Sequence, residues 1–174
     1  MWHWLVDRVR DALDLPPKTA PAVPFRHPVY GEFAEDSSNP GSHAPAKVDW
    51  LGAPVDFCPD ASFGTREQGA VIKEASFATM DALMADQSVW HERLKKAVLA
   101  EVHPIYLEYW HDPDEGPALS EEAFWSHLKL DNISTYEEGE FAFVLELGEE
   151  IPSTHIIDAS GSLEDGFTDV ALSS

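Results

Sequence analysis

The order of the apolar patterns along the chain restricts its fold more than any other feature. Residues 27–60 and residues 133–172 have strand-like texture, with apolar and polar side chains alternating in several short runs. Residues 65–110, between them, repeat apolar side chains with the period of a helix. Strands at both ends and helices in the middle predict an α+β fold rather than strict βα alternation. We expect a mainly antiparallel sheet from the N- and C-terminal strands, with the central helices packed on one face and the other face free for a partner.

The N-terminal β region predicts three strands, at residues 29–33, 48–51 and 55–58. Residues 37–42, Ser-Ser-Asn-Pro-Gly-Ser, have the composition of a loop, and Gly52-Ala-Pro suits a tight reversal.

Two central helices are predicted, over residues 65–85 and 88–110, the second with Ser88 as its N-cap. The first is apolar on most sides, which indicates a central position. In the second, His103 lies opposite the apolar stripe, and Pro104 should kink or split the helix. That stripe consists of Leu94, Val98, Val102, Ile105 and Tyr109.

The C-terminal part begins with a short helix, for which Ser120 is the expected N-cap. Four strands are predicted after it, at residues 133–136, 140–147, 155–158 and 167–172. Glu138-Gly139 makes the first two of these a hairpin. Phe141, Phe143 and Leu145 give the second strand one apolar face.

The chain length of 174 residues suits one domain with a short appendage. We expect an amphipathic helix over residues 1–15, a Pro-rich linker over residues 16–26, and a single α+β domain over residues 27–174. The first residues become charged too early for a signal peptide, and no apolar run approaches the length of a membrane span. A cytoplasmic location in a bacterium-like cell is therefore the expectation.

The charge of the chain is concentrated in its last third. Beyond Trp110 there are sixteen carboxylates, and Lys129 is the only Lys or Arg, so this part contributes −15 of the formal −21. The first 110 residues carry sixteen carboxylates and ten Lys or Arg, a balance of −6. Such a field repels nucleic acid and anionic membranes and attracts basic partners. Solubility is the competing explanation, although it does not require the cations to be absent from one third of the chain.

The strand motifs resemble those of a family of uncharacterised bacterial α+β domains. The resemblance lies in Pro28-Val-Tyr-Gly-Glu-Phe, in Val48-Asp-Trp-Leu-Gly, in Val55-Asp-Phe, and in a C-terminal short helix followed by a Phe-rich and a His-containing strand. It covers about residues 27–172. Members of that family have Glu-His-Gly where this chain has Thr154-His155-Ile156, so only His155 matches. Several members lie beside polymorphic toxin genes and are regarded as immunity proteins, which implies an inhibitor of a toxin.

Charge and resemblance together predict a non-enzymatic binding protein, an immunity-type inhibitor that neutralises a basic protein partner through an acidic surface. We expect aromatic anchors surrounded by carboxylates near hairpin ends. The partner-binding residues predicted on this basis are Trp125, Tyr136, Glu137, Glu138, Glu140, Glu149 and Glu150.

Two other classes of function remain open. A metal-dependent hydrolase would use His111, Asp112, Asp114 and His155, although these lack the ligand spacing of a known metal motif. A DNA-mimic regulator would use its carboxylates in place of phosphates. Cys58 has no neighbouring base in the sequence, which favours a structural thiol over a nucleophile. No catalytic or cofactor-binding signature is present, so no cofactor is expected.

Overall fold

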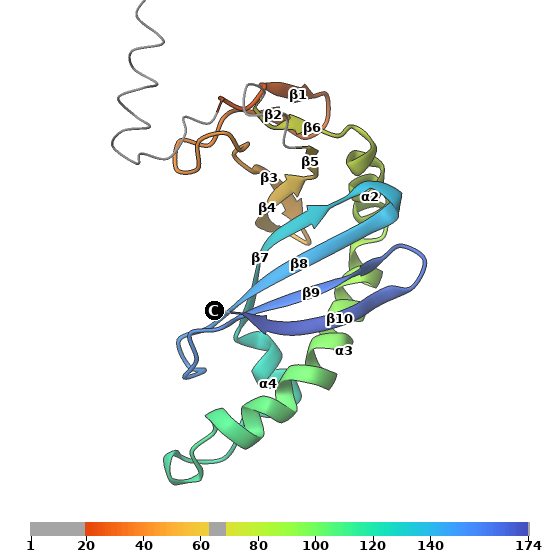
Figure 1. Cartoon of the computed structure of the whole chain (residues 1–174). Coiled ribbons are helices and arrows are strands. Elements are labelled where there is room, and N and C mark those ends of the chain that lie inside the picture. Colours follow the sequence, from red (N-terminus) through yellow and green to blue (C-terminus); the bar gives the residue numbers. More distant parts are fainter. Residues whose placement is uncertain (1–19, 63–68, 174) are drawn as a thin grey trace, which may run out of the picture.

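A computed structural model describes residues 20–62 and 69–173 of the chain (Figure 1). The amphipathic helix predicted over residues 1–15 lies outside these residues, as do residues 16–19 of the predicted linker. Phe25 and Arg26, which the sequence placed in that linker, belong to the first strand, β1 (Phe25–His27).

A six-stranded sheet forms the centre of the fold, with the strand order β10-β9-β8-β7-β4-β3. Neighbouring strands are antiparallel except for β4 and β7, which pair in parallel with Asp56 opposite Asn132. The predicted α+β class with a mainly antiparallel sheet from both ends of the chain is therefore confirmed. The strands are β3 (Ala46–Trp50), β4 (Ala53–Pro59), β7 (Leu128–Thr135), β8 (Glu140–Leu147), β9 (Ile156–Ser162) and β10 (Gly166–Ser173).

Three helices pack on one face of this sheet, as predicted (Figure 1). They are α2 (Ala75–Ala85), α3 (Gln87–Ile105) and α4 (Glu121–Ser126). Trp90 of α3 meets Phe141 of β8 edge to face, with ring centroids 5.2 Å apart. Phe141, Phe143 and Leu145 are almost fully buried, which confirms the apolar face predicted for this strand. Burial of such aromatic surface is the main driving force for joining the two layers.

Two small hairpins lie beside the main sheet, and the first corrects the strand predicted over residues 29–33. Residues 28–30 form a turn, and only β2 (Gly31–Phe33) is extended, paired with β1. Nδ1 of His27 accepts hydrogen bonds of 3.3 Å from the backbone N–H groups of both Val29 and Tyr30, which folds the turn. Gly31 follows with a φ of +87°, a value that favours glycine.

The second hairpin corrects the first predicted helix. β5 (Ala61–Ser62) pairs with β6 (Val71–Ile72). Val71 and Ile72, which were predicted to lie in a helix over residues 65–85, are therefore extended, and α2 begins ten residues later than predicted. Residues 65–68 of that prediction lie outside the described part of the chain. A short apolar run has the same appearance in a buried strand and in a helix, which explains the error.

Pro104 changes the second helix in a way that the sequence predicted only in outline. The α-helical part ends at Ile105, and a π-helical turn, η1 (Tyr106–Trp110), follows it. Because the wider turn shifts the helix face, Tyr106 is buried in place of Tyr109, whose side chain is 71% exposed. The assignment of His103 to the exposed face was wrong. The ring is buried, and its Nε2 lies 2.9 Å from the carbonyl oxygen of Leu119.

The remaining C-terminal elements agree with the sequence except at some boundaries. The hydroxyl oxygen of Ser120 accepts a hydrogen bond from the N–H of Ala123, which confirms the N-cap of α4. Two short 3₁₀ turns occur, η2 (Pro113–Glu115) and η3 (Glu137–Gly139), and the second joins β7 to β8 as the predicted hairpin. β7 begins five residues before the predicted start, and β9 begins just after His155.

Candidate functional site

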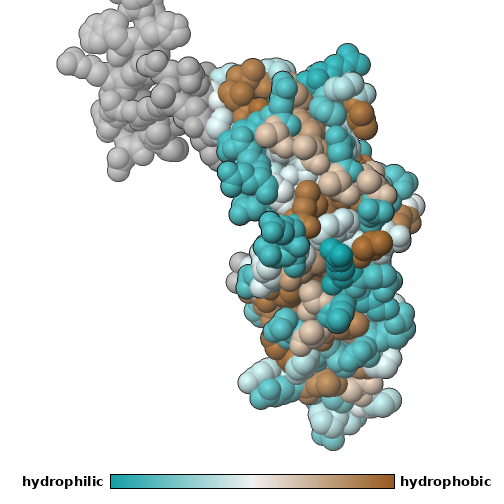
Figure 2. Space-filling view, turned by 90° about the vertical axis from the view of Figure 1, so that its right-hand side faces the viewer, coloured by the Kyte–Doolittle hydropathy of each residue, from teal (hydrophilic) through white to brown (hydrophobic). Residues whose placement is uncertain are grey.

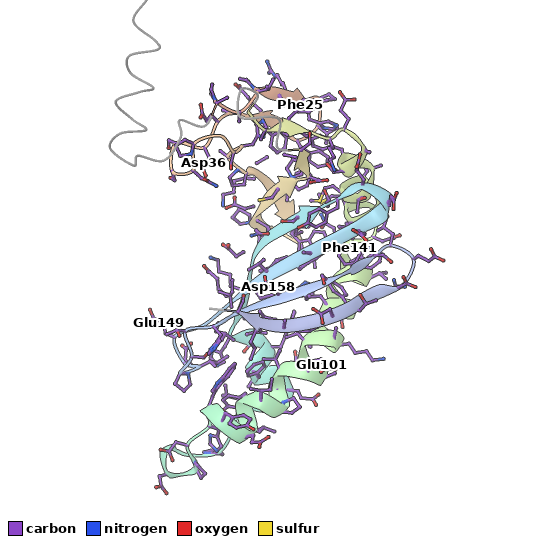
Figure 3. All side chains as sticks on the ribbon, in the orientation of Figure 1. Phe25, Asp36, Glu101, Phe141, Glu149 and Asp158 are labelled. Carbon is purple, nitrogen blue, oxygen red and sulfur yellow. The ribbon has the colours of Figure 1, made fainter. Side chains whose placement is uncertain are left out.

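The face of the six-stranded sheet opposite the helices, here called the open face, carries many carboxylates. Because Phe141, Phe143 and Leu145 point toward the helices, side chains at alternate positions and their register partners point to the open face. Figure 3 labels one residue of each kind, Phe141 on the helix side and Asp158 on the open face. The open-face carboxylates are Asp49, Asp56, Asp131, Glu140, Glu146, Asp158 and Asp169.

Two lysines share the open face, and both already neutralise a carboxylate on it. Nζ of Lys47 lies 2.6 Å from Oδ1 of Asp56, and Nζ of Lys129 lies 3.0 Å from Oε2 of Glu146. Seven carboxylates and two lysines leave a net charge of −5 on this face. The charges of Asp131, Asp158 and Asp169 are therefore not compensated by a lysine of the same face, and their field extends into the solvent.

The centre of the open face is made of short side chains. Ser134 of β7 lies opposite Ala142 of β8, and Ala142 lies opposite Ser160 of β9. Val144 and Ala171 extend this strip along the neighbouring positions. Short side chains give a flat surface that another protein can approach closely.

The acidic residues predicted from hairpin ends do not form one patch. Glu137, Glu138 and Glu140 lie where β7 turns into β8, whereas Glu149 and Glu150 lie beyond the other end of β8. At about 3.3 Å per residue, the eight residues of β8 separate the two groups by about 26 Å. Each group also has a local partner: Lys73 Nζ is 3.0 Å from Glu137 Oε2, and His127 Nδ1 is 3.1 Å from Glu150 Oε2.

The two predicted anchors also lie apart. Trp125, on α4, is half-buried on the helix side, where its ring meets that of His91 edge to face at 5.3 Å. Tyr136 follows β7, is 39% exposed, and accepts a hydrogen bond of 3.0 Å at its carbonyl oxygen from the hydroxyl of Thr79. Among the predicted residues, the structure thus brings together Tyr136, Glu137, Glu138 and Glu140 only.

Two of the residues proposed for a metal-dependent hydrolase, Asp112 and His155, have side chains in local hydrogen bonds. Oδ1 of Asp112 accepts a hydrogen bond of 2.9 Å from the N–H of Asp114, and Nδ1 of His155 lies 2.8 Å from Oγ of Ser153. Within residues 20–62 and 69–173, no three His, Cys, Asp or Glu side chains are arranged to hold a metal ion. Nothing in this geometry favours the hydrolase.

Cys58 is half-buried on the open face, in a pocket of about 240 Å³ that Ser134 and Tyr136 also line. Burial raises the pKa of the Cys58 thiol to about 11, and the charges of Asp56 and Asp131 add to the shift. Since a thiol must ionise to attack, this environment opposes nucleophilic catalysis.

The carboxylates at the turns are conspicuous in the sequence, whereas those at the centre of the sheet were not predicted as binding residues. Asp158 and Asp169 occupy polar positions of alternating strands, and this period-two pattern was the signal that could have placed them on one face. Asp131 follows no such pattern because it lies at a β-bulge between Leu130 and Asn132.

Comparison with known proteins gives one family. Residues 44–172 match the profile of a family described as "Uncharacterized protein conserved in bacteria (DUF2262)". No curated protein and no solved structure matches the chain significantly. In the part of the chain that is described, no helix has both the length and the apolar character needed to cross a membrane.

Proposed function

Because the chain belongs to DUF2262, a family of uncharacterised proteins conserved in bacteria, we propose its function from the open face: non-enzymatic binding of a basic protein. The observation that supports it most is the net charge of −5 on this sheet face, where both lysines are already paired with carboxylates. We propose further that the bound protein is a toxin and that this chain neutralises it as a cytoplasmic immunity-type inhibitor.

Charge supports a basic partner over other kinds. The whole chain carries a formal charge of −21, so long-range attraction acts on cations and repels nucleic acid. Attraction of this kind mainly raises the association rate, and the contact itself then depends on close packing at the centre of the interface. The strip of Ser134, Ala142 and Ser160 supplies that centre.

The area of the open face indicates how the acidic residues beyond the two ends of β8 would contribute to the proposed interface. Six strands spaced by about 4.8 Å, each with about seven residues of about 3.3 Å, give an area of about 550 Å². A stable interface needs about 800 Å² from each partner. A partner centred on the open face must therefore extend past its edges, where Glu137 and Glu138 lie at one end of β8 and Glu149 and Glu150 at the other.

The immunity-type role rests on the resemblance of the strand motifs to bacterial domains that accompany toxin genes. In such a pair, the inhibitor must bind before the toxin acts, and electrostatic steering provides the necessary speed. The proposed mechanism is occlusion of a basic surface of the toxin, with no reaction carried out by this chain.

A rate measurement with charge-matched variants tests the proposal. The partner is the product of the neighbouring gene, captured by pull-down with the full chain. Asp131, Asp158 and Asp169 are replaced together by Asn, and the control replaces Glu92, Glu101 and Glu121 on α3 and α4 by Gln, so both variants lose three negative charges. We expect the association rate to fall about tenfold or more in the open-face variant only, and to fall with added salt in the wild type.

Three outcomes would contradict parts of the proposal. Equal losses in both variants would show that net charge acts without a docking face. Association that does not respond to salt would exclude steering. Competition by duplex DNA for the same partner would assign the carboxylates to the DNA-mimic class, whereas protection of cells that express the partner supports the immunity-type role.

A further inference from the structure

A second concave surface lies at the end of the sheet, apart from the open face. It is a pocket of about 690 Å³ between Trp110 of η1 and the loop that joins β8 to β9. Its volume lies within the range of about 300–1,000 Å³ that is typical of ligand sites. Leu147, which lines it, lies two residues after Leu145 in β8 and so on the same face, which places the pocket on the helix side of the sheet. The lining residues that the argument uses are Trp110, Leu147, Glu149, Ile151, Pro152 and His155.

The aromatic wall of this pocket is fixed in place. The π-helical turn after Pro104 is closed by a hydrogen bond of 2.9 Å from the N–H of His111 to the carbonyl oxygen of Tyr106. This turn brings Trp110 against His155, with ring centroids 6.0 Å apart and planes 19° from parallel. Single π-helical turns occur frequently at functional sites.

His155 is held in turn by Ser153. Oγ of Ser153 lies 2.8 Å from Nδ1 of the ring, and it accepts a hydrogen bond of 3.2 Å from the backbone N–H of His155. The two contacts fix both the main chain and the ring of His155. A binding wall that is already ordered loses little conformational entropy when a ligand arrives.

The charge of the pocket selects a cation. Glu149 is the carboxylate of its lining, and no Lys or Arg contributes to the lining among the described residues. Glu149 is exposed, and Figure 3 labels it on the loop between β8 and β9. An indole ring attracts a cation placed over its face, and a carboxylate beside it adds a charged hydrogen-bond acceptor.

The apolar part of the lining selects a long side chain that carries this cation. Leu147 and Pro152 present hydrocarbon surface next to Trp110 and Glu149, above the buried side chain of Ile151. The methylene groups of an arginine can cover such a surface while its planar guanidinium stacks on the indole and forms paired hydrogen bonds with the carboxylate. We propose that this pocket binds an arginine side chain of a peptide or protein. The site uses none of the open-face residues and shares only Glu149 with the margin of the interface proposed above, so binding of an arginine peptide here can be tested without the toxin partner.

Peptide titrations followed by NMR test the site. The full chain, labelled with ¹⁵N, is titrated with acetyl-Gly-Arg-Gly-amide, and the indole N–H signal of Trp110, assigned through Trp110→Phe, reports binding. The same peptides with lysine and with citrulline, a neutral analogue of arginine, serve as comparisons. We expect saturable binding of the arginine peptide, weaker binding of the lysine peptide, and at least about tenfold weaker binding of the citrulline peptide.

Two variants with the same change of charge locate the effect. Glu149→Gln should weaken binding of the arginine peptide about tenfold, whereas Glu92→Gln, on α3 and outside the lining of the pocket, should leave it unchanged. Unshifted signals of core residues confirm that each variant is folded. Equal binding of arginine and citrulline, equal weakening by both variants, or no saturable shift of the Trp110 signal would each overturn the proposal.

Discussion

The hydroxyl of Tyr30 donates a hydrogen bond of 2.6 Å to Oδ1 of Asp81, which joins the turn between β1 and β2 to the exposed side of α2. The same junction contains a ring stack, since the rings of His27 and Phe77 lie 4.1 Å apart and 12° from parallel. Tyr30 itself is nearly buried. Because β1 and β2 form a separate two-stranded sheet, contacts of this kind rather than ladder hydrogen bonds attach the hairpin to the helix layer.

Tyr30→Phe should lower the free energy of unfolding at pH 7 by about 1 kcal/mol, the value of a hydrogen bond whose charged acceptor is exposed to solvent. Chemical denaturation measures this change. An unchanged free energy of unfolding would show that a hydrogen bond from water to Asp81 replaces the one from Tyr30 at no cost.

The same tyrosine should make the fold sensitive to alkali. Burial, followed by the hydrogen bond and charge of Asp81, raises the pKa of Tyr30 above its ordinary value of about 10. Because the pKa of Tyr30 is higher in the folded than in the unfolded state, its contribution to stability is fully present below pH 10. That contribution is lost as the pH rises further. Unfolding curves at pH 9 and pH 11 should therefore differ less for Tyr30→Phe than for the wild type.

Gly161→Ala should destabilise the sheet by about 2 kcal/mol or more. A Cβ at this position of β9 would lie 1.9 Å from the carbonyl oxygen of Gly166 in β10, a contact that only movement of the backbone can relieve. Thermal unfolding measures the loss. Gly52→Ala is the comparison for an open turn, where a Cβ meets no atom within 4 Å and the positive φ is the only cost.

Cys58 should react slowly with alkylating reagents. With its pKa raised to about 11, mainly by burial, the thiol ionises at pH 8 at least about 100-fold less than an ordinary cysteine. Asp56→Asn removes the largest charge contribution and should speed alkylation severalfold, whereas Asp169→Asn on the same face should not. Fast alkylation of the folded wild type would contradict this environment.

His91 should contribute to unfolding by acid. Desolvation lowers its pKa in the folded state below the ordinary value of about 6.5, and its Nδ1 is buried with no hydrogen-bond partner among the described residues. The unfolded chain then binds the proton more readily, so the contribution is complete above pH 6.5 and is lost as the pH falls through the lower folded-state pKa. His91→Leu should lose less stability than the wild type between pH 7.5 and pH 5. Both proteins share all the carboxylates, so the difference isolates His91.

Sequence patterns predicted the parts of the fold that are governed by local chemistry. The hairpin was predicted from the pair Glu138-Gly139, because glycine favours the positive φ that such a turn requires. Both residues do adopt positive φ. The N-cap at Ser120 and the buried alternation from Phe141 to Leu145 were found for similarly local reasons. In each case the neighbouring residues alone determine the conformation.

The errors arose where distant contacts determine the conformation. Ile72 is extended because β6 pairs with β5, and His103 is buried because its ring reaches the carbonyl oxygen of Leu119. Likewise, Trp110 and His155 are far apart in the sequence, so no pattern could place them on one pocket wall. The carboxylates at the turns were visible as a group in the sequence, but β8 separates them in space.

The parallel pairing of β4 with β7 imposes an order on biosynthesis. When the ribosome has produced the β3–β4 hairpin, Asp56 and its neighbours still present a bare strand edge, because their partners around Asn132 have not been made. All three helices must emerge before that edge is covered. The nascent polypeptide therefore exposes an unpaired strand edge through much of its translation, and the carboxylate of Asp56 in that strand opposes self-association during that interval.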